Sequence, residues 1–305
     1  MRSIRDFSRE EWLRNKPLDH FLIQFCNDHL QHVFRALRPR PLRQFLQSAA
    51  SLEGKNIGLV IAYEQPWALD WLLRMASRHI VDMTLLVFDN SRSKSARVDI
   101  ERVCRDAGAP YLGLPPSPTK HPNRSHGMAM TWVFYNVVKK IRPKMFTYID
   151  HDLIPMEKIE MGRLLGDQPF YGMPNVSRWG WSLWAGYCSY DFSVVRDLPL
   201  NFLNDFSMGL DTGGRNWFSL YRNFDRARFR FASMNKAPVR DPLDGANRVL
   251  FAMDGNWIHL GGASYRPGFK SELDFLQRIA RATDEGATLT TLMAERTSES
   301  TRSHI

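Results

Sequence analysis

Two aspartates separated by one residue, Asp150 and Asp152, are the clearest candidates for chemistry in the chain. They follow an apolar run over 145–149, whose aromatic and β-branched side chains predict a buried strand. Carboxylates at the carboxyl edge of such a strand lie where open α/β sheets bind ligands. Because carboxylate oxygens are hard ligands, the pair suits Mg²⁺ or Mn²⁺ carrying a substrate diphosphate. The alternative is an acidic turn that caps the strand, with Pro155 stopping the ladder beyond it.

The elements that must position these aspartates alternate between strands and helices. Apolar runs predict strands over 56–63, 83–88, 109–112 and 145–149. Apolar residues at helical spacing predict helices from Pro66, over 93–107 and over 127–141. This order is a repeated βαβ pattern with right-handed crossovers. The predicted fold class is therefore α/β, with a Rossmann-like, mostly parallel central sheet and helices on both faces.

Composition limits the classes of protein that this chain can represent. At 305 residues, 44% of them hydrophobic and 12% aromatic, it can form a substantial core, which excludes a mainly disordered chain. The formal net charge of +9 at pH 7 favours anionic partners such as nucleotides, phosphorylated acceptors or an acidic membrane face. We expect no nucleic-acid partner, because the basic residues are spread along the chain without a recognised binding motif.

The cysteines and the first residues indicate where the protein works. Cys26, Cys104 and Cys188 are odd in number and widely spaced, which argues against a disulfide framework or a zinc site and favours a reducing compartment. The first sixteen residues mix charges and lack the apolar region of a secretory signal. No stretch approaches the roughly 20 apolar residues of a membrane span. We expect a soluble, cytoplasmic protein.

The first part of the chain is helical and basic. Apolar and aromatic residues recur there at helical spacing and suggest an amphipathic face, at Phe21, Leu22, Phe25, Cys26 and His29. A run of arginines follows, broken by two prolines, at Arg35, Arg38, Arg40 and Arg43. One interpretation is peripheral contact with the inner face of a membrane or with a lipid diphosphate. The other is a solvated helical extension packed on the core.

After Pro155 the alternation of strands and helices ends. Short strands are predicted over 170–173 and 184–190, with a loop over 177–181 between them. A further short strand and a glycine turn are predicted over 256–262, and a frayed tail from about Asp284.

The order of these motifs resembles a GT-A glycosyltransferase, particularly the bacterial family-2-like kind. The resemblance covers roughly residues 55 to 265 and depends on seven short motifs, at 57–63, 88–91, 123–128, 148–152, 184–186, Asp211 and 259–262. Their order and spacing carry it, because each motif alone is common. The resemblance implies three parts: a helical, basic extension over 1–53, a GT-A domain over 54–270, and a C-terminal helix with a flexible tail over 271–305. Within the domain, 54–155 would bind the nucleotide and 156–270 the acceptor.

The resemblance also implies a nucleotide-sugar site at the first two strand ends. Ala62, Tyr63 and Asp89 would line the base and ribose pocket, since a carboxylate accepts from base N–H groups or ribose hydroxyls. Asp89 could equally be a helix N-cap or an Asx-turn residue. Arg124, just before the helix predicted from Gly127, would meet phosphate oxygens, or it is a solvated loop residue.

The metal site implied by the resemblance is the pair of aspartates with a late histidine. Asp152 would bind Mn²⁺ or Mg²⁺ directly, and Asp150 would reach the ribose, or the ion through water. His259 would complete the shell, which favours Mn²⁺ because imidazole suits it better. The alternative for His259 is a core or loop histidine bonded to backbone.

The same resemblance implies a catalytic base in the second half of the chain. Asp211 lies where inverting members place the carboxylate that takes the acceptor hydroxyl's proton; the alternative is a helix N-cap. Asp205 and Asp191 are weaker candidates. One or two of five tryptophans would stack on a sugar, among Trp179, Trp181, Trp184, Trp217 and Trp257.

The predicted function is therefore that of a metal-dependent hexosyltransferase-like enzyme. It would transfer a sugar from a nucleotide-diphosphate sugar to a carbohydrate or lipid-linked acceptor, with inversion, in cell-envelope polysaccharide or glycolipid synthesis. A haloacid-dehalogenase-like phosphatase also carries two aspartates after a strand, but near the start of its domain, and Ile154 stands where it has threonine or valine. A sugar nucleotidyltransferase would need glycines over 62–66, which are absent. A catalytically inactive relative that still binds the nucleotide sugar is a further alternative.

Overall fold

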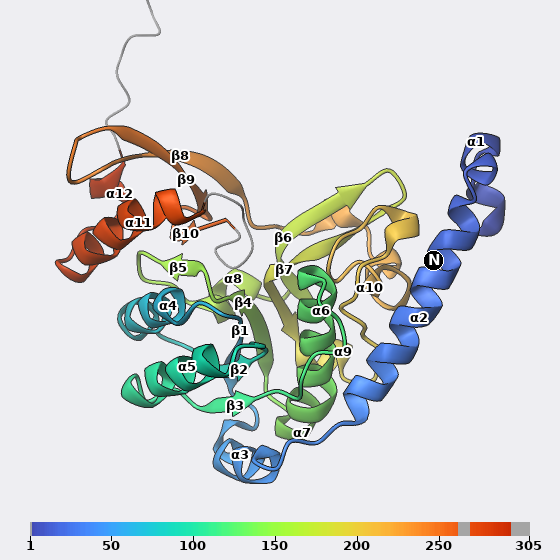
Figure 1. The fold of residues 1–305 in the computed structure, drawn as a ribbon, viewed down its shortest axis with the longest axis horizontal. Coiled ribbons are helices and arrows are strands. Elements are labelled where there is room, and N and C mark those ends of the chain that lie inside the picture. Colours follow the sequence, from blue (N-terminus) through green and yellow to red (C-terminus); the bar gives the residue numbers. More distant parts are fainter. Residues whose placement is uncertain (1, 262–268, 294–305) are drawn as a thin grey trace, which may run out of the picture.

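The structure, a computed structural model, describes residues 2–261 and 269–293 (Figure 1). Its central sheet has six strands in the order β3-β2-β1-β4-β7-β6. These strands are β1 (Asn56–Ala62), β2 (Thr84–Asp89), β3 (Tyr111–Gly113), β4 (Met145–Asp150), β6 (Phe170–Ser177) and β7 (Gly180–Asp191). The first four run parallel, whereas β7 runs antiparallel to β4 and β6 antiparallel to β7. The predicted α/β fold with a mostly parallel sheet is confirmed.

Helices cover both faces of this sheet, because successive side chains of a strand point to opposite sides. On one face, Val60 of β1 packs in the same cluster as Trp71 of α4 (Pro66–His79) and residues of α5 (Lys94–Asp106). On the other face, Leu59 packs with Trp132 of α6 (Pro122–Val133) and with α3 (Leu42–Ser48). Continuous apolar runs such as β1 therefore reflect burial on both sides.

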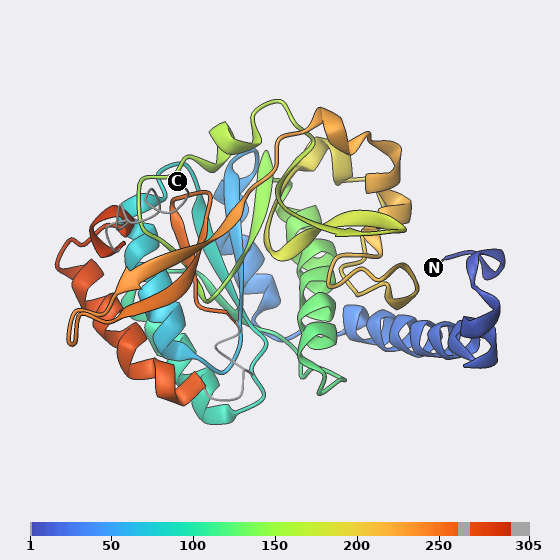
Figure 2. The ribbon, with the colours of Figure 1, turned by 90° about the horizontal axis from the view of Figure 1, so that it is seen from above.

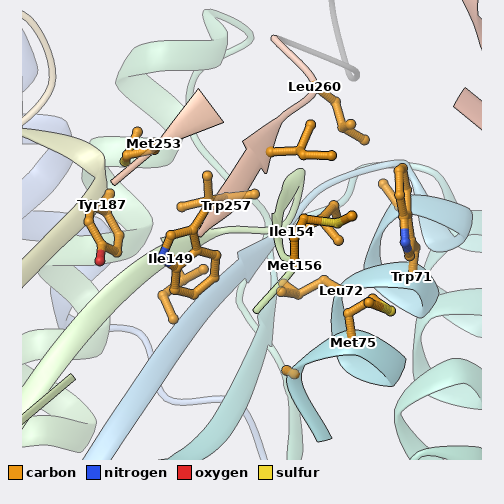
Figure 3. Close-up of a cluster of buried hydrophobic side chains, with 14 of the residues drawn as sticks. Trp71, Leu72, Met75, Ile149, Ile154, Met156, Tyr187, Met253, Trp257 and Leu260 are labelled. Atoms are coloured by element: carbon orange, nitrogen blue, oxygen red, sulfur yellow. The ribbon is translucent and has the colours of Figure 1, made fainter. Parts of the chain in front are cut away.

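A second, antiparallel sheet of four strands stands beside the first, in the order β5-β10-β9-β8. Its strands are β5 (Leu153–Pro155), β8 (Met234–Arg240), β9 (Asn247–Met253) and β10 (Trp257–His259). Figure 3 shows Met253 and Trp257 of this sheet in one cluster with Ile149, Ile154 and Met156. The two sheets thus share a core. The sequence predicts neither β8 nor β9.

Pro155 does not stop the ladder, as the sequence predicts, but is the last residue of β5 and pairs with Trp257. β5 is an edge strand of its sheet, where a proline's missing N–H is tolerated.

The N-terminal part is helical, with α1 (Arg9–Leu13) and α2 (Lys16–Ala36) preceding α3. In two perpendicular views α2 lies at the edge of the molecule, and it contacts α6 (Figures 1 and 2). In the part of the chain that the structure describes, no helix is both long and apolar enough to cross a bilayer.

Two predicted boundaries are wrong. The helix predicted over 127–141 begins at Pro122, where the ring fits the first turn, and continues through a π-helical turn, Phe134–Val138, into α7 (Lys139–Ile141). The loop predicted over 177–181 is a tight turn, and both flanking strands extend into it.

The stretch after Asp284, predicted to fray, includes α12 (Leu289–Leu292), whose Leu289 and Leu292 are buried. Residues 294–305 of the predicted tail, and Gly262 of the predicted glycine turn, lie outside the described residues. The remaining helices are three short ones, α8 (Met161–Leu165), α9 (Phe192–Val195) and α10 (Asn216–Ser219), and the longer α11 (Phe269–Asp284). Single 3-10 turns occur at 4–6, 50–52, 206–208, 221–223 and 226–228.

Candidate functional site

A cavity of about 340 Å³ opens where β1, β2 and β4 end, within the size range of small-molecule sites. The polar and aromatic residues of its wall are Tyr63, Asn90, Asn123, His126, Asp150, His151, Asp152, Trp184, Asp211, Thr212 and His259. They come from strand ends, from the first turns of α6, from β7, from the loop before α10 and from β10. The cavity therefore gathers segments from both sheets at one edge.

Asp150, Asp152 and His259 form the metal-ligating cluster of this cavity. One ligand atom from each lies within 4.8 Å of the others. β10 pairs with β5, which sets His259 opposite Leu153. The Leu260 amide donates to the Asp152 carbonyl at 3.0 Å and extends this pairing by one residue. The structure thus brings together the three residues that the sequence assigns to a metal.

This donor set fits a Mn²⁺ or Mg²⁺ ion. Two ligand atoms of an ion bound at about 2.1 Å lie about 3 to 4 Å apart, and His259 Nε2 lies 3.6 Å from Asp152 Oδ1. Burial and then the negative charge of Asp152 raise the pKa of Asp150. A bound cation would offset both effects.

His126 joins this cluster from α6, with Nε2 3.5 Å from Asp150 Oδ1. Burial lowers the pKa of His126 to about 4, so its imidazole is neutral at pH 7. It therefore supplies no positive charge against the two carboxylates. In the sequence, His126 belongs to the short motif over 123–128 and lies just before the helix predicted from Gly127. Its role beside Asp150 follows from the early start of α6, which puts Asn123 and His126 on one face.

Arg124 points elsewhere. Its Nη1 donates to Asn27 Oδ1 of α2 at 3.3 Å, and Arg124 is not among the described residues that line the cavity. The predicted position before a helix is wrong, because Arg124 lies inside the first turn of α6. Successive helical residues face different directions, so the side chain beside Asn123 turns to α2.

Gly186 of β7 leaves room for the acidic pair. A Cβ atom at this position would lie 2.4 Å from Asp150 Oδ2 and 2.4 Å from the indole ring of Trp184. Trp184 in turn meets His259 with ring centroids 4.9 Å apart and an interplanar angle of 69°. Among the five tryptophans considered for sugar stacking, Trp184 is the one in the described cavity wall.

Asp211 lies on the wall of the same cavity and is held at one oxygen. Its Oδ1 accepts from Asn204 Nδ2 at 2.6 Å and from Asn123 Nδ2 at 3.2 Å, with Thr212 Oγ1 at 3.4 Å. Oδ2 accepts no hydrogen bond from the described residues. Asp211 does not cap α10, whose N-cap is Arg215. Asn204 is a residue that the sequence analysis misses, since no motif surrounds it.

The two weaker candidates for a base have local structural roles. Asp205 caps the turn at 206–208 by accepting from the Met208 amide, and Asp191 caps α9 by accepting from the Ser193 amide.

The strand-end residues divide into two groups. Tyr63 and Asn90 line the cavity, whereas Ala62 and Asp89 are fully buried and are not among the described lining residues. Asp89 Oδ1 accepts from the Ser91 amide at 2.8 Å, and Oδ2 accepts from the Tyr111 hydroxyl at 3.0 Å. The first of these bonds forms an Asx turn, the alternative considered from the sequence.

Comparisons with known proteins find likeness only among solved structures. No family model and no curated protein matches the chain. An active-site mutant of LgtC aligns with a TM-score of 0.35 and 12% identity, covering 46% of this chain and 59% of that chain. The mannosyltransferase PcManGT from Pyrobaculum calidifontis, in complex with GDP-Man and Mn²⁺, aligns with a TM-score of 0.35 and 8% identity, covering 58% and 56%.

Glucosyl-3-phosphoglycerate synthase from Mycobacterium tuberculosis, in complex with Mn²⁺, UDP and glucosyl-3-phosphoglycerate, is also similar. It aligns with a TM-score of 0.34 and 16% identity, covering 54% of this chain and 66% of that chain. The chain therefore spans less than two thirds of the length of each of these three structures.

Proposed function

We propose that this protein is a metal-dependent glycosyltransferase that moves a sugar from a nucleoside-diphosphate sugar to an acceptor hydroxyl. The observation that carries the proposal is the pairing of two features in one cavity. A cluster of two carboxylates and an imidazole, Asp150, Asp152 and His259, shares that cavity with a hydrogen-bonded carboxylate, Asp211. The first suits a diphosphate with its cation, and the second suits proton removal from a hydroxyl.

In this proposal Asp150, Asp152 and His259 hold Mn²⁺ or Mg²⁺. When bound, the ion would neutralise the charge on the departing nucleoside diphosphate. Tyr63 and Asn90 contact the nucleoside at the ends of β1 and β2. Ala62 and Asp89, assigned to that pocket from the sequence, would then act by shaping the strand ends that carry these two residues.

Asp211 is the proposed catalytic base. Its Oδ2 takes the proton of the acceptor hydroxyl while the hydroxyl oxygen forms its bond to the anomeric carbon. The bond from that carbon to the diphosphate oxygen breaks on the opposite side, so the configuration inverts. Asn204 and Asn123 donate to Oδ1, which leaves Oδ2 for the acceptor hydroxyl. Trp184 offers an aromatic face to the sugar.

The acceptor that we propose is a carbohydrate, free or on a lipid carrier, in cell-envelope polysaccharide or glycolipid synthesis. The charge of +9 at pH 7 favours phosphorylated acceptors and an anionic membrane face. We also propose that the protein works in the cytoplasm, at the inner face of the membrane.

Calorimetric titration tests the metal-dependent donor site. UDP, GDP and their common sugar conjugates are titrated with and without Mn²⁺ into the wild type, Asp152→Ala and a control, Asp99→Ala, whose side chain is 39% exposed on α5. We expect one nucleotide to bind only with Mn²⁺, to wild type and control but not to Asp152→Ala. Absence of nucleotide binding under every condition would overturn the proposal. The anomeric configuration of the product, read by NMR, tests inversion.

A further inference from the structure

Helix α2 has an apolar side that faces away from the protein. Large apolar side chains with exposed fractions of 48% to 64% recur along it at Leu18, Phe21, Leu22, Phe25 and Val33. Their spacing of three and four residues puts them on one side of the helix. His29, His32 and Ala36 complete that side, so it carries no aspartate, glutamate, lysine or arginine. We call these eight residues the outer face of α2.

The opposite side of α2 packs on the body of the protein through polar and apolar side chains. Phe34 is only 1% exposed and lies in the core with Leu30. Asn27 and Gln31 are only 2% and 5% exposed. Asn27 Oδ1 accepts from Arg124, and Gln31 Nε2 donates to the Met128 carbonyl at 3.5 Å. Amphipathic helices of globular proteins usually bury the apolar side. Here these hydrogen bonds and Phe34 hold one side of α2 on the protein, and the outer face is a second apolar side that is exposed and left for a partner.

Basic residues continue the chain beyond the C-terminal end of this helix. Arg38, Arg40 and Arg43 are exposed and line a groove beside α3. No aspartate or glutamate occurs between Asp28 and Glu53. An apolar helical face followed directly by an uncompensated basic cluster is the combination that binds an anionic membrane surface.

We propose that the outer face of α2 docks in the headgroup region of a bilayer rich in anionic lipids, with the helix in the membrane plane. Its apolar residues enter the boundary of the acyl chains, while the arginines contact lipid phosphates. Membrane binding that is stable usually needs two such contributions, and both occur here within residues 18–43.

A second copy of the chain fits this face less well. A parallel pair of α2 helices would set the two arginine clusters against each other, which is repulsive. An antiparallel pair would set the half with Leu18, Leu22 and Phe25 against the half with His29 and His32. An anionic bilayer meets both the apolar half and the basic end with a complementary surface.

Docking in this way would fix the cavity relative to the bilayer. α2 is hydrogen-bonded to α6, and α6 brings Asn123 and His126 to the cavity wall. This arrangement favours an acceptor carried by a membrane lipid, an inference that rests on the proposed function. The docking itself does not depend on catalysis and is measured without any sugar donor.

Vesicle flotation tests the docking. Full-length protein is mixed with phosphatidylcholine vesicles or with vesicles that also contain phosphatidylglycerol. We expect flotation with the anionic vesicles. High salt should weaken this binding, because salt screens the attraction between the arginines and the lipid phosphates. Replacing three arginines, R38Q/R40Q/R43Q, should weaken binding roughly a hundredfold, from about fivefold for each. The variant L18Q/L22Q/F25Q should lose flotation, while V98Q, at a 65% exposed site on α5, should float like wild type.

Two results would overturn the proposal. One is that wild type fails to float with anionic vesicles. The other is that light scattering finds a dimer for the wild type and a monomer for L18Q/L22Q/F25Q, while the two proteins float equally. In that case a second copy of the chain covers the outer face of α2. Mn²⁺-dependent nucleotide binding, measured on the same samples, separates failure of docking from failure of the glycosyltransferase proposal.

Discussion

His259 Nε2 lies 3.6 Å from Asp152 Oδ1, although the two residues are far apart in the sequence. Their proximity results from the pairing of β10 with β5, the strand that begins directly after Asp152. The contact is longer than a hydrogen bond and connects a nitrogen and an oxygen that can both ligate a metal. The three-residue cluster with Asp150 depends on this one strand pairing.

Replacing His259 tests that cluster. Loss of even a ligand's supporting hydrogen bond costs roughly tenfold to a hundredfold in metal affinity, so His259→Ala should weaken Mn²⁺ binding by about a hundredfold or more. Electron paramagnetic resonance of free Mn²⁺ measures this directly. His32→Ala, on the exposed side of α2, is the control. Unchanged Mn²⁺ affinity in His259→Ala would leave the histidine with a structural role only.

Gly186→Ala tests the room around Asp150. The added Cβ would lie 2.4 Å from Asp150 Oδ2 and from the Trp184 ring, so both side chains must move. We expect weaker Mn²⁺ binding with a modest fall in Tm, because the neighbouring strands stay paired. Ala185→Ser, one residue earlier on the same strand, should bind Mn²⁺ nearly as the wild type does. Normal Mn²⁺ affinity in Gly186→Ala would show that the carboxylate position is not critical.

Asn204→Ala tests how Asp211 is held. This change removes the 2.6 Å hydrogen bond to Asp211 Oδ1 and leaves only the longer ones from Asn123 and Thr212, so the carboxylate is held less tightly. We expect kcat to fall about tenfold with little change in the KM of the donor, whereas Asp211→Asn should lower kcat about a thousandfold. Asn204→Asp keeps the size of the side chain but lacks the amide donor, so its kcat should stay below that of the wild type. A fall in kcat that is accompanied by a large fall in Tm would instead indicate a purely structural role.

The stability of the C-terminal helix should depend on pH through Asp241. Hydrogen bonds from Arg278 of α11, at 2.6 Å and 2.8 Å, hold the pKa of Asp241 well below its usual range. A carboxyl with a lowered folded-state pKa stabilises the protein above its unfolded pKa of about 3.9, and this contribution is lost as the pH falls further.

Thermal unfolding of Asp241→Asn against wild type measures this contribution. The variant should have a Tm lower by a few degrees near pH 7, and the difference should shrink below about pH 4. Asp244→Asn, with a 48% exposed side chain on the same hairpin, is the control and should differ little. A difference that stays constant down to low pH would contradict the role of ionised Asp241.

Part of the fold follows directly from local sequence. The continuous apolar run of β1 and the helical spacing in α4 specify a buried strand and a helix, because each pattern has one way to bury its apolar atoms. The hairpin of β8 and β9 is missed because most of β8 is exposed, and its two buried positions, Ala237 and Val239, are too few to establish an alternating pattern. The start of α6 is missed because Pro122 follows three prolines within seven residues, and prolines in such a stretch indicate a loop as readily as a first helical turn.

The sequence by itself determined the neighbours that are close along the chain. Asp150 and Asp152 must lie together at the end of β4, since one residue separates them and the strand before them is buried. The same local reasoning shows that α2 has an apolar side. It does not show which way that side turns, because helical periodicity defines a face but not its partner.

Only the tertiary structure decided which distant residues meet. His259 reaches Asp152 through strand pairing, Asn123 of α6 reaches Asp211, and Gln31 and Phe34 fix which side of α2 faces the protein. These relationships depend on hydrogen bonds and packing between segments far apart in the chain, which a local pattern of residue types does not encode. Local sequence therefore determines the placement of the two aspartates of the cavity, whereas tertiary structure determines the placement of the residues that meet them.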